Sequence, residues 1–298
     1  MMETDVAPDT IVSPSIGTAQ VADGTHLRTL TWPTAGAPVA IALIVHGLGE
    51  HGGRYGNVAD AMTRAGIEAH SYDHRGHGGS GGRRNHIERW EQLHDDLQER
   101  IEGLREAKPG LPLVLYGHSM GGLIVAGYVV AAKDRPLPDL LVLSAPALDD
   151  GLPRWKHTLA RVLTDVVPKV PIANALPSDG LSRDPAVQAK VDADPLASNT
   201  STVRFGAEAF AEQDRVKAVL AGLDAMPVPT YVFHGAADPI VPVRASEVFG
   251  RLSNTTRHVH DGLRHECHHE PEHAHVLDEV VTWIGEQGVP IREDRTAV

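Results

Sequence analysis

A serine lies between two glycines at the junction of an expected strand and an expected helix. The apolar run at residues 113–116 favours a buried β-strand, and GHSMG at residues 117–121 leads directly into an apolar helical pattern. In so sharp a turn the hydroxyl projects above the edge of the sheet, and the flanking glycines remove Cβ atoms that would clash there. The pattern predicts a nucleophile at Ser119. A serine that only caps the helix would give the same five residues.

Two backbone N–H groups are candidates for an oxyanion hole beside this serine. The N–H of Met120 opens the helix, where the helix dipole favours an anion. A continuous apolar run over residues 39–45 favours a strand buried on both faces, and the glycine-rich stretch HGLGEH at residues 46–51 follows it. The N–H of Leu48 in this loop is the second candidate donor, although the glycines alone would also suit an ordinary turn.

An aspartate and a histidine downstream could complete a catalytic triad, because a serine hydroxyl needs a base and the base needs an orienting carboxylate. Asp238 follows an expected strand at residues 229–233, and His265 follows a last short strand at residues 256–260. The order serine, aspartate, histidine is that of the α/β-hydrolase triad. Aspartate before proline is also an ordinary turn signal. The distance from the strand favours His265, but spacing alone leaves three neighbours open: His260, His268 and His269.

Two further motifs are weak matches to other chemistries. G-x-G-x-x-G at residues 76–81 fits the dinucleotide fingerprint, but the segment continues as a loop, and a convincing helical pattern starts only near Ile87. HECHH at residues 265–269 fits the zinc-protease pattern, which requires two histidines one turn apart on an established helix. The first segment continues as a loop, and the second is a loop before Pro271. We therefore expect neither a bound NAD nor a catalytic metal.

The composition is that of a globular protein with an acidic balance. The 298 residues can hold one large α/β domain with an insertion, or at most two domains. A net charge of −12 disfavours nucleic acid and anionic lipid as partners, because both attract clustered lysine and arginine. The single cysteine, Cys267, excludes an internal disulfide. The sequence shows neither a membrane span nor a signal-peptide pattern, so we expect a cytoplasmic or peripherally membrane-associated protein.

Strand and helix patterns alternate along most of the chain, which predicts an α/β fold with a mostly parallel central sheet flanked by helices. We expect a flexible tail at residues 1–15, a core at residues 16–148 and 206–298, and an inserted helical cap at residues 149–205, where the alternation stops. Apolar residues at helical spacing over residues 155–167 could line an acyl pocket, contact a lipid surface or simply pack on the core.

Six motifs spread along the chain also occur together in one known family. They are HGLGEHGGRY (46–55), DHRGHGGSGG (73–82), GHSMGG (117–122), LSAPAL (143–148), HGAADPIVP (234–242) and GLRHECHHEPE (262–272). Together they resemble the monoacylglycerol lipases of the α/β-hydrolase superfamily, especially actinobacterial ones, and the likeness covers nearly the whole chain. The serine motif and the aspartate loop occur across the superfamily, whereas HGLGEH and the histidine loop followed by Glu270 are more specific to the family.

By position, the resemblance implies a triad in which Ser119 is the nucleophile, His265 the base and then the acid, and Asp238 its orienter. It implies hydrolysis of monoacylglycerol to glycerol and a fatty acid through an acyl-enzyme, without a metal or an organic cofactor. A broader carboxylesterase or lysophospholipase with the same triad is an alternative, because the sequence does not show the depth of the acyl pocket. A non-catalytic ligand-binding protein on the same fold is an alternative of another class.

The resemblance also implies roles for residues around the triad. The backbone N–H groups of Leu48 and Met120 would form the oxyanion hole, and Glu50 and Arg54 would shape the polar end of the pocket where glycerol leaves. The family often has an aromatic residue where this chain has Arg264, which leaves open what forms the pocket wall there.

Overall fold

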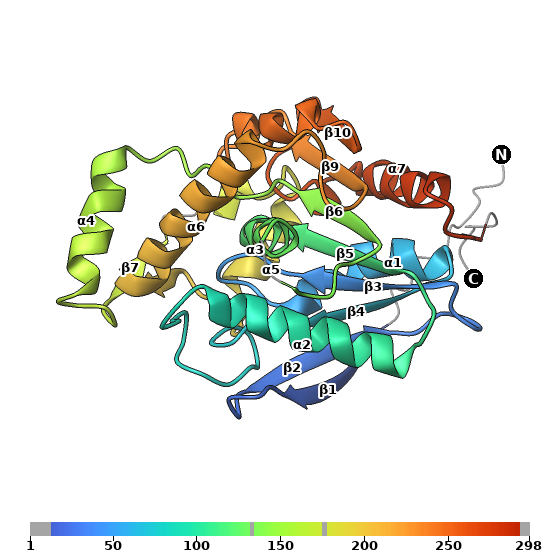
Figure 1. Ribbon diagram of the computed structural model, residues 1–298, viewed down its shortest axis with the longest axis horizontal. Coiled ribbons are helices and arrows are strands. Elements are labelled where there is room, and N and C mark those ends of the chain that lie inside the picture. Colours follow the sequence, from blue (N-terminus) through green and yellow to red (C-terminus); the bar gives the residue numbers. More distant parts are fainter. Residues whose placement is uncertain (1–12, 132–133, 175–177, 293–298) are drawn as a thin grey trace.

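The structure is a computed structural model that describes residues 13–131, 134–174 and 178–292 (Figure 1). Of the tail expected at residues 1–15, the part up to residue 12 lies outside the described residues, and Ser15 already begins the first strand. Among the helices of the described chain, none combines the length and the apolar content that crossing a bilayer requires.

An eight-stranded sheet forms the centre of the described part of the chain (Figure 1). All neighbours from β4 to β10 are parallel, whereas β1 and β2 form an antiparallel hairpin that joins the sheet at the β4 edge. The predicted mostly parallel sheet is confirmed. In spatial order the strands are β1 (Ser15–Gln20), β2 (His26–Trp32), β4 (Ile67–Tyr72), β3 (Ala40–Val45), β5 (Leu113–His118), β6 (Leu140–Ser144), β9 (Thr230–Gly235) and β10 (Thr255–His260).

Helices cover both faces of the sheet, because successive apolar side chains of a strand point to opposite faces. In β3, Ile41 and Leu43 belong to one core cluster, whereas Ala42 and Ile44 belong to the other. Burial on both faces explains why β3 is apolar at every position. The helices are α2 (Glu91–Ala107), α3 (Met120–Val129) and α6 (Val203–Ala221) on the first face, and α1 (Gly56–Arg64) and α7 (His273–Glu286) on the second.

Two of these helices begin at residues other than those expected. α2 begins at Glu91 and not near Ile87, because Ile87 is buried in the preceding loop and continues the apolar pattern without helical backbone. α6 begins at Val203, within the stretch 149–205 expected to be cap, because Thr202 caps it by accepting a hydrogen bond from the Phe205 N–H.

Residues 149–202, which we call the cap segment, separate β6 from α6 and interrupt the alternation of strands and helices. The expected apolar helix is α4, which stands at the side of the molecule against α6 (Figure 1). The rings of His157 and Phe210 stack between these two helices with centroids 4.1 Å apart. The elements of the cap segment are α4 (Arg154–Thr164), β7 (Pro171–Ala173), the short 3-10 turn Ser178–Gly180, α5 (Pro185–Asp192) and β8 (Thr200–Thr202).

Buried histidines fix the loops that follow β3 and β4. His46 Nε2 accepts a hydrogen bond from the His74 N–H at 2.9 Å, and His74 Nε2 donates to the His46 carbonyl at 3.0 Å. Burial lowers the pKa of His46 to about 3 and that of His77 to about 4, so both rings stay neutral. The neutral ring of His46 can accept the N–H of His74, which the charged ring could not do.

We expect the melting temperature to fall as the pH is lowered from 7 to 5. In the unfolded chain His46 and His77 titrate near their ordinary pKa of 6.5, whereas in the folded state they bind no proton in this range. The unfolded state therefore binds more protons than the folded state below about pH 6.5. The contribution of each neutral histidine to the free energy of unfolding is fully present above that pH. Below it, this contribution falls by up to about 1.4 kcal/mol per pH unit for each histidine. Differential scanning calorimetry measures the profile.

A His77→Gln variant removes one of these groups and should give a flatter pH profile than the wild type. His26→Gln is the matched control, because His26 is exposed and its loss should leave the slope unchanged. A wild-type melting temperature that is constant from pH 7 to 5 would contradict the assignment.

Candidate active site

Ser119 lies in the sharp turn between β5 and α3, as the sequence predicts. Its backbone has φ 53° and ψ −117°, and a left-handed conformation of this kind costs a residue with a Cβ about 1–2 kcal/mol. Glycines allow the surrounding backbone to pack closely. A Cβ on Gly121 would collide with the carbonyl oxygens of Val45 and His46, and one on Gly117 would collide with the Gly121 carbonyl. The turn is therefore pressed against the end of β3.

Two backbone N–H groups beside Ser119 have no hydrogen-bond acceptor within the described part of the chain, those of Leu48 and Met120. Met120 is the first residue of α3, so its N–H belongs to the positive end of the helix dipole. A Cβ on Gly47 would lie 3.3 Å from Ser119 Cβ, so the loop that carries Leu48 lies directly beside the serine. Both N–H groups therefore remain candidate oxyanion donors.

Asp238 and His265 meet where the loops after β9 and β10 come together. His265 Nδ1 lies 2.7 Å from Asp238 Oδ2, and the Asp238 side chain is fully buried. The same oxygen accepts a second bond from His234 Nε2 at 3.0 Å, and Oδ1 accepts the N–H groups of Ile240 and Val241. Burial alone would raise the pKa of Asp238, but His265 and these hydrogen bonds hold it far below its ordinary value. The carboxylate therefore stays ionised and orients the imidazole.

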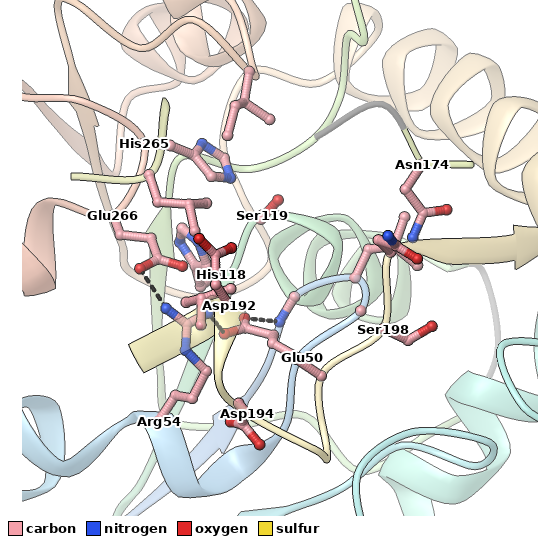
Figure 2. A pocket seen from close by; sticks show the side chains of 18 residues that line it. Glu50, Arg54, His118, Ser119, Asn174, Asp192, Asp194, Ser198, His265 and Glu266 are labelled. Atoms are coloured by element: carbon pink, nitrogen blue, oxygen red, sulfur yellow. Dashed lines mark hydrogen bonds and ion pairs between the residues drawn. The ribbon is translucent and has the colours of Figure 1, made fainter. Parts of the chain in front are cut away.

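Ser119 and His265 line one cavity of about 530 Å³ at the carboxyl end of the sheet (Figure 2). Leu48, Glu50 and Arg54 also line it. Because His265 uses Nδ1 to bind Asp238, its Nε2 is the nitrogen available to the serine hydroxyl. Among the described residues no hydrogen bond joins Ser119 Oγ to His265, and such bonds often tighten only when substrate binds.

Glu50 is buried and accepts hydrogen bonds from three sides. Its Oε1 accepts the Gly47 N–H at 2.5 Å and the Tyr55 hydroxyl at 2.6 Å, and its Oε2 lies 2.8 Å from Arg54 Nη1. Arg54 in turn binds Glu266 Oε2 at 2.7 Å (Figure 2). Burial alone would raise the pKa of Glu50, but the charge of Arg54 holds it far below its ordinary value. The pair thus presents a fixed charged network to the cavity and anchors the loop that carries Leu48.

The cap segment supplies the facing wall and is bound to this same loop. His51 Nε2 lies 2.7 Å from Asp194 Oδ2, and the Ser198 N–H donates to the Gly49 carbonyl at 2.7 Å. Five polar residues of the cap segment line the cavity, of which the first four are labelled in Figure 2: Asn174, Asp192, Asp194, Ser198 and Asn199.

Arg264 does not belong to the cavity lining that the structure gives. Its Nη1 donates to the carbonyl oxygens of Asp179 and Ser182 in the cap segment, and its backbone N–H donates to Glu270 Oε1 at 2.7 Å. Glu270 is fully buried and also accepts the Arg183 N–H at 3.0 Å. The arginine that departs from the family pattern therefore ties the histidine loop to the cap segment.

Neither of the two weak motifs has the geometry that its chemistry requires. Residues 76–81 lie in a loop and open no helix. In the stretch 265–269, only Cys267–His269 form a short 3-10 turn, and His265 is bound to Asp238. The two histidines of the zinc-protease pattern therefore do not lie one turn apart on an α-helix.

The fold and this site define a serine hydrolase of the α/β-hydrolase class. A family model described as "Serine aminopeptidase, S33" matches residues 36–272. The chain is 35% identical over 258 residues to a monoacylglycerol lipase of Mycolicibacterium smegmatis, covering 85% of this chain and 90% of that protein. The chain therefore belongs to this serine hydrolase family, in the branch of the monoacylglycerol lipases, and it is an ester hydrolase.

Two more similarities agree with this membership. The chain is 29% identical to the human monoglyceride lipase, with 89% of each chain covered. The crystal structure of a Paleococcus ferrophilus monoacylglycerol lipase matches with a TM-score of 0.77 and 29% identity, covering 88% of this chain and 99% of that one.

Several residues of the site had no signal in the sequence. His234, four residues before Asp238, shares that carboxylate with His265. Glu266 neutralises Arg54, and this pair joins segments that are distant in the sequence. His118 lines the cavity with its ring centroid 4.7 Å from that of His265. Burial lowers the pKa of His118 well below its ordinary value, so a neutral ring lies beside the catalytic imidazole. The serine motif includes His118, but its position next to Ser119 did not reveal this contact.

We expect Glu50→Gln to reduce both turnover and stability. Glu50 now accepts hydrogen bonds from three donors, and the amide nitrogen of a glutamine would face one of them. The loop that carries Leu48 would therefore shift. We expect kcat to fall about 100-fold, the effect of losing one oxyanion donor. Breaking a buried ion pair also costs about 3 kcal/mol in the free energy of unfolding. Steady-state kinetics on a soluble ester and urea denaturation measure the two effects.

Glu68→Gln is the matched control for this prediction. Glu68 is also buried and lies 3.0 Å from Lys108 Nζ, but it is near the amino end of β4, away from the cavity. It should lower stability without lowering kcat. An equal loss of kcat in both variants would show that general destabilisation, and not the position of the loop, explains the effect.

Proposed function

We propose that this ester hydrolase cleaves monoacylglycerols to glycerol and a free fatty acid. The observation that carries the proposal is the cavity that brings Ser119 and His265 together with the unpaired N–H of Leu48 and with polar groups from the core and the cap segment. The names of the relatives from M. smegmatis, humans and P. ferrophilus support the same substrate class.

In the proposed mechanism Ser119 is the nucleophile. His265 Nε2 takes the proton of the serine hydroxyl as Oγ attacks the ester carbonyl, while Asp238 stabilises the imidazolium through Nδ1. The N–H groups of Leu48 and Met120 stabilise the negative charge on the tetrahedral intermediate. The intermediate collapses when His265 returns the proton to the departing glycerol oxygen. Water that loses its proton to His265 then attacks the acyl-enzyme and releases the fatty acid.

The charges around the cavity favour an uncharged, hydroxyl-bearing leaving group. Glu50, Asp192, Asp194 and Glu266 contribute carboxylates to the lining, against the single guanidinium of Arg54. Carboxylates accept hydrogen bonds from glycerol hydroxyls, whereas they repel the phosphate of an anionic lysophospholipid. We therefore propose that Glu50 and Arg54 lie at the end where glycerol leaves, and that monoacylglycerols are better substrates than lysophospholipids.

Fatty-acid release from matched mono-, di- and triacylglycerols, a lysophospholipid and a simple ester tests the substrate class. We expect monoacylglycerol to be turned over fastest. Equal turnover of the simple ester or the lysophospholipid would keep the serine chemistry but replace the proposal by a broader carboxylesterase or lysophospholipase.

Two variants test the triad on the same substrates. Ser119→Ala and Asp238→Asn should each reduce kcat by roughly 10⁴-fold, because one removes the nucleophile and the other removes the charge that orients His265. Asp261→Asn is the matched control, since Asp261 is exposed on a neighbouring loop. A kcat of Ser119→Ala within about tenfold of the wild-type value would overturn the nucleophile assignment. A phosphonate that fails to label Ser119 would favour a non-catalytic binding protein.

The cap segment presents apolar side chains that the core leaves uncovered. Trp155 is 62% exposed and Val166 is 75% exposed, and no residue of α4 is buried. Monoacylglycerols partition into lipid surfaces, and exposed apolar side chains on a segment that also supplies a wall of the cavity suit transient contact with such a surface. We therefore propose that the cap segment acts as a lid that touches neutral lipid when substrate enters, with the net charge opposing adsorption to anionic lipid.

Sedimentation with phosphatidylcholine vesicles tests this contact. We expect Trp155→Ser with Val166→Ser to reduce the vesicle-bound fraction at least threefold while hydrolysis of a soluble ester stays at the wild-type level, because the changes remove only exposed apolar area. Ile16→Ser is the matched control, since Ile16 is 64% exposed but lies on β1. Absence of wild-type sedimentation, together with activity that vesicles do not change, would count against lipid contact.

A further inference from the structure

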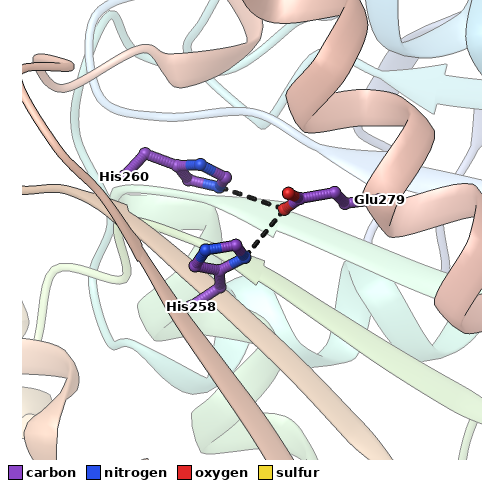
Figure 3. Close-up of side chains that lie close together, drawn as sticks. All are labelled: His258, His260 and Glu279. Atoms are coloured by element: carbon purple, nitrogen blue, oxygen red, sulfur yellow. Dashed lines mark ion pairs between the residues drawn. The ribbon is translucent and has the colours of Figure 1, made fainter.

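We propose that His258, His260 and Glu279 form a binding site for a divalent transition-metal ion of the zinc class, at the β10 edge of the sheet and outside the catalytic cavity (Figure 3). Each residue offers one ligand atom, and all three atoms lie within 4.8 Å of one another. Within the described chain, this is the group that combines histidine and carboxylate ligands at such spacing.

The secondary structure brings the three side chains together. His258 and His260 are two residues apart on β10, so both point to the same face of the sheet, and their rings stack with centroids 4.4 Å apart. α7 covers this face, and Glu279 reaches from it towards both rings (Figure 3). The site therefore joins the last strand of the sheet to the final helix.

The distances need only small side-chain adjustments to fit one ion. Glu279 Oε2 lies 2.7 Å from His258 Nδ1 and 3.7 Å from His260 Nε2. Two atoms that each bind Zn²⁺ at about 2.0–2.2 Å in a tetrahedral arrangement are about 3.4 Å apart. The side chain of His258 is 46% exposed, so its ring can rotate and lengthen the 2.7 Å distance from its Nδ1 to Glu279 Oε2.

An unpartnered nitrogen points to a ligand at this place. His260 is only 8% exposed, and its Nε2 has no hydrogen-bond partner among the described residues, although it faces Glu279 (Figure 3). An unpaired buried nitrogen is costly unless something binds it. The hydroxyl of Tyr231 lies 3.3 Å from Glu279 Oε2 and orients the carboxylate, as residues behind metal ligands commonly do.

The donor set selects the class of ion. Two imidazoles with one carboxylate suit zinc and its transition-metal neighbours, whereas calcium and magnesium require oxygen ligands. Three protein ligands leave the remaining coordination to water. The nearby His275 contacts the other oxygen of Glu279 at 3.2 Å and is largely exposed. An ion here would hold α7 against β10 and stabilise the edge of the core, without taking part in ester hydrolysis.

Isothermal titration with ZnCl₂ on the full chain, purified without a histidine tag and freed of metal by a chelator, tests the site. We expect one saturable site in the wild type and at least a tenfold weaker affinity in both His258→Gln and Glu279→Gln. Zinc should raise the melting temperature of the wild type and not that of these variants, because an ion that binds only the folded state stabilises it. Hydrolysis of a soluble ester reports that each variant is folded.

His26→Gln serves as the control for nonspecific loss of a surface histidine and should bind zinc like the wild type. Wild-type affinity in both ligand variants would overturn the proposal, as would the absence of saturable binding to the wild type. Zinc inhibition of ester hydrolysis with unchanged affinity in His258→Gln would place the ion at the catalytic histidine and would also overturn it.

Discussion

The close approach of the Ser119 turn to the end of β3 is the constraint on which the site depends. The left-handed backbone of Ser119 is accessible to a serine only at a cost, and the surrounding structure has to maintain it. Contact between Gly121 and the carbonyl oxygens of Val45 and His46 does so, because no side chain separates the two segments. The same contact brings the loop after β3 beside the serine, so the proposed nucleophile and the proposed oxyanion donors are fixed by one packing arrangement.

Buried ionised groups also fix the geometry of the site, although removing them from water costs free energy. Asp238 and Glu50 are both buried, yet the pKa of each lies far below its ordinary value because cationic or N–H groups surround it. Each carboxylate holds one part of the site in place. Asp238 orients the imidazole of His265, and Glu50 anchors the loop that carries Leu48. Such groups contribute little net stability, since their attraction mainly offsets the loss of hydration, but they specify geometry.

The cap segment is connected to the chemistry through backbone and side-chain contacts with that same loop. The Ser198 N–H donates to the Gly49 carbonyl and Asp194 binds His51, while α4 exposes apolar side chains such as Trp155 and Val162. A displacement of the cap segment would therefore act on the loop that carries Leu48, the proposed oxyanion donor.

The sequence by itself determined most of the elements and placed the candidate triad residues Ser119, Asp238 and His265 after their strands. Local signals are sufficient for this, because the glycines around Ser119, the apolar run before Asp238 and the short strand before His265 act over a few residues. The starts of α2 and α6 differed from expectation, since burial in a preceding loop imitates a helical pattern and a threonine cap acts earlier. Only the tertiary structure decided that Glu266 neutralises Arg54 and that Arg264 turns to the cap segment. These pairings depend on which chain segments fold next to one another, and residues distant in sequence carry no local signal of that contact.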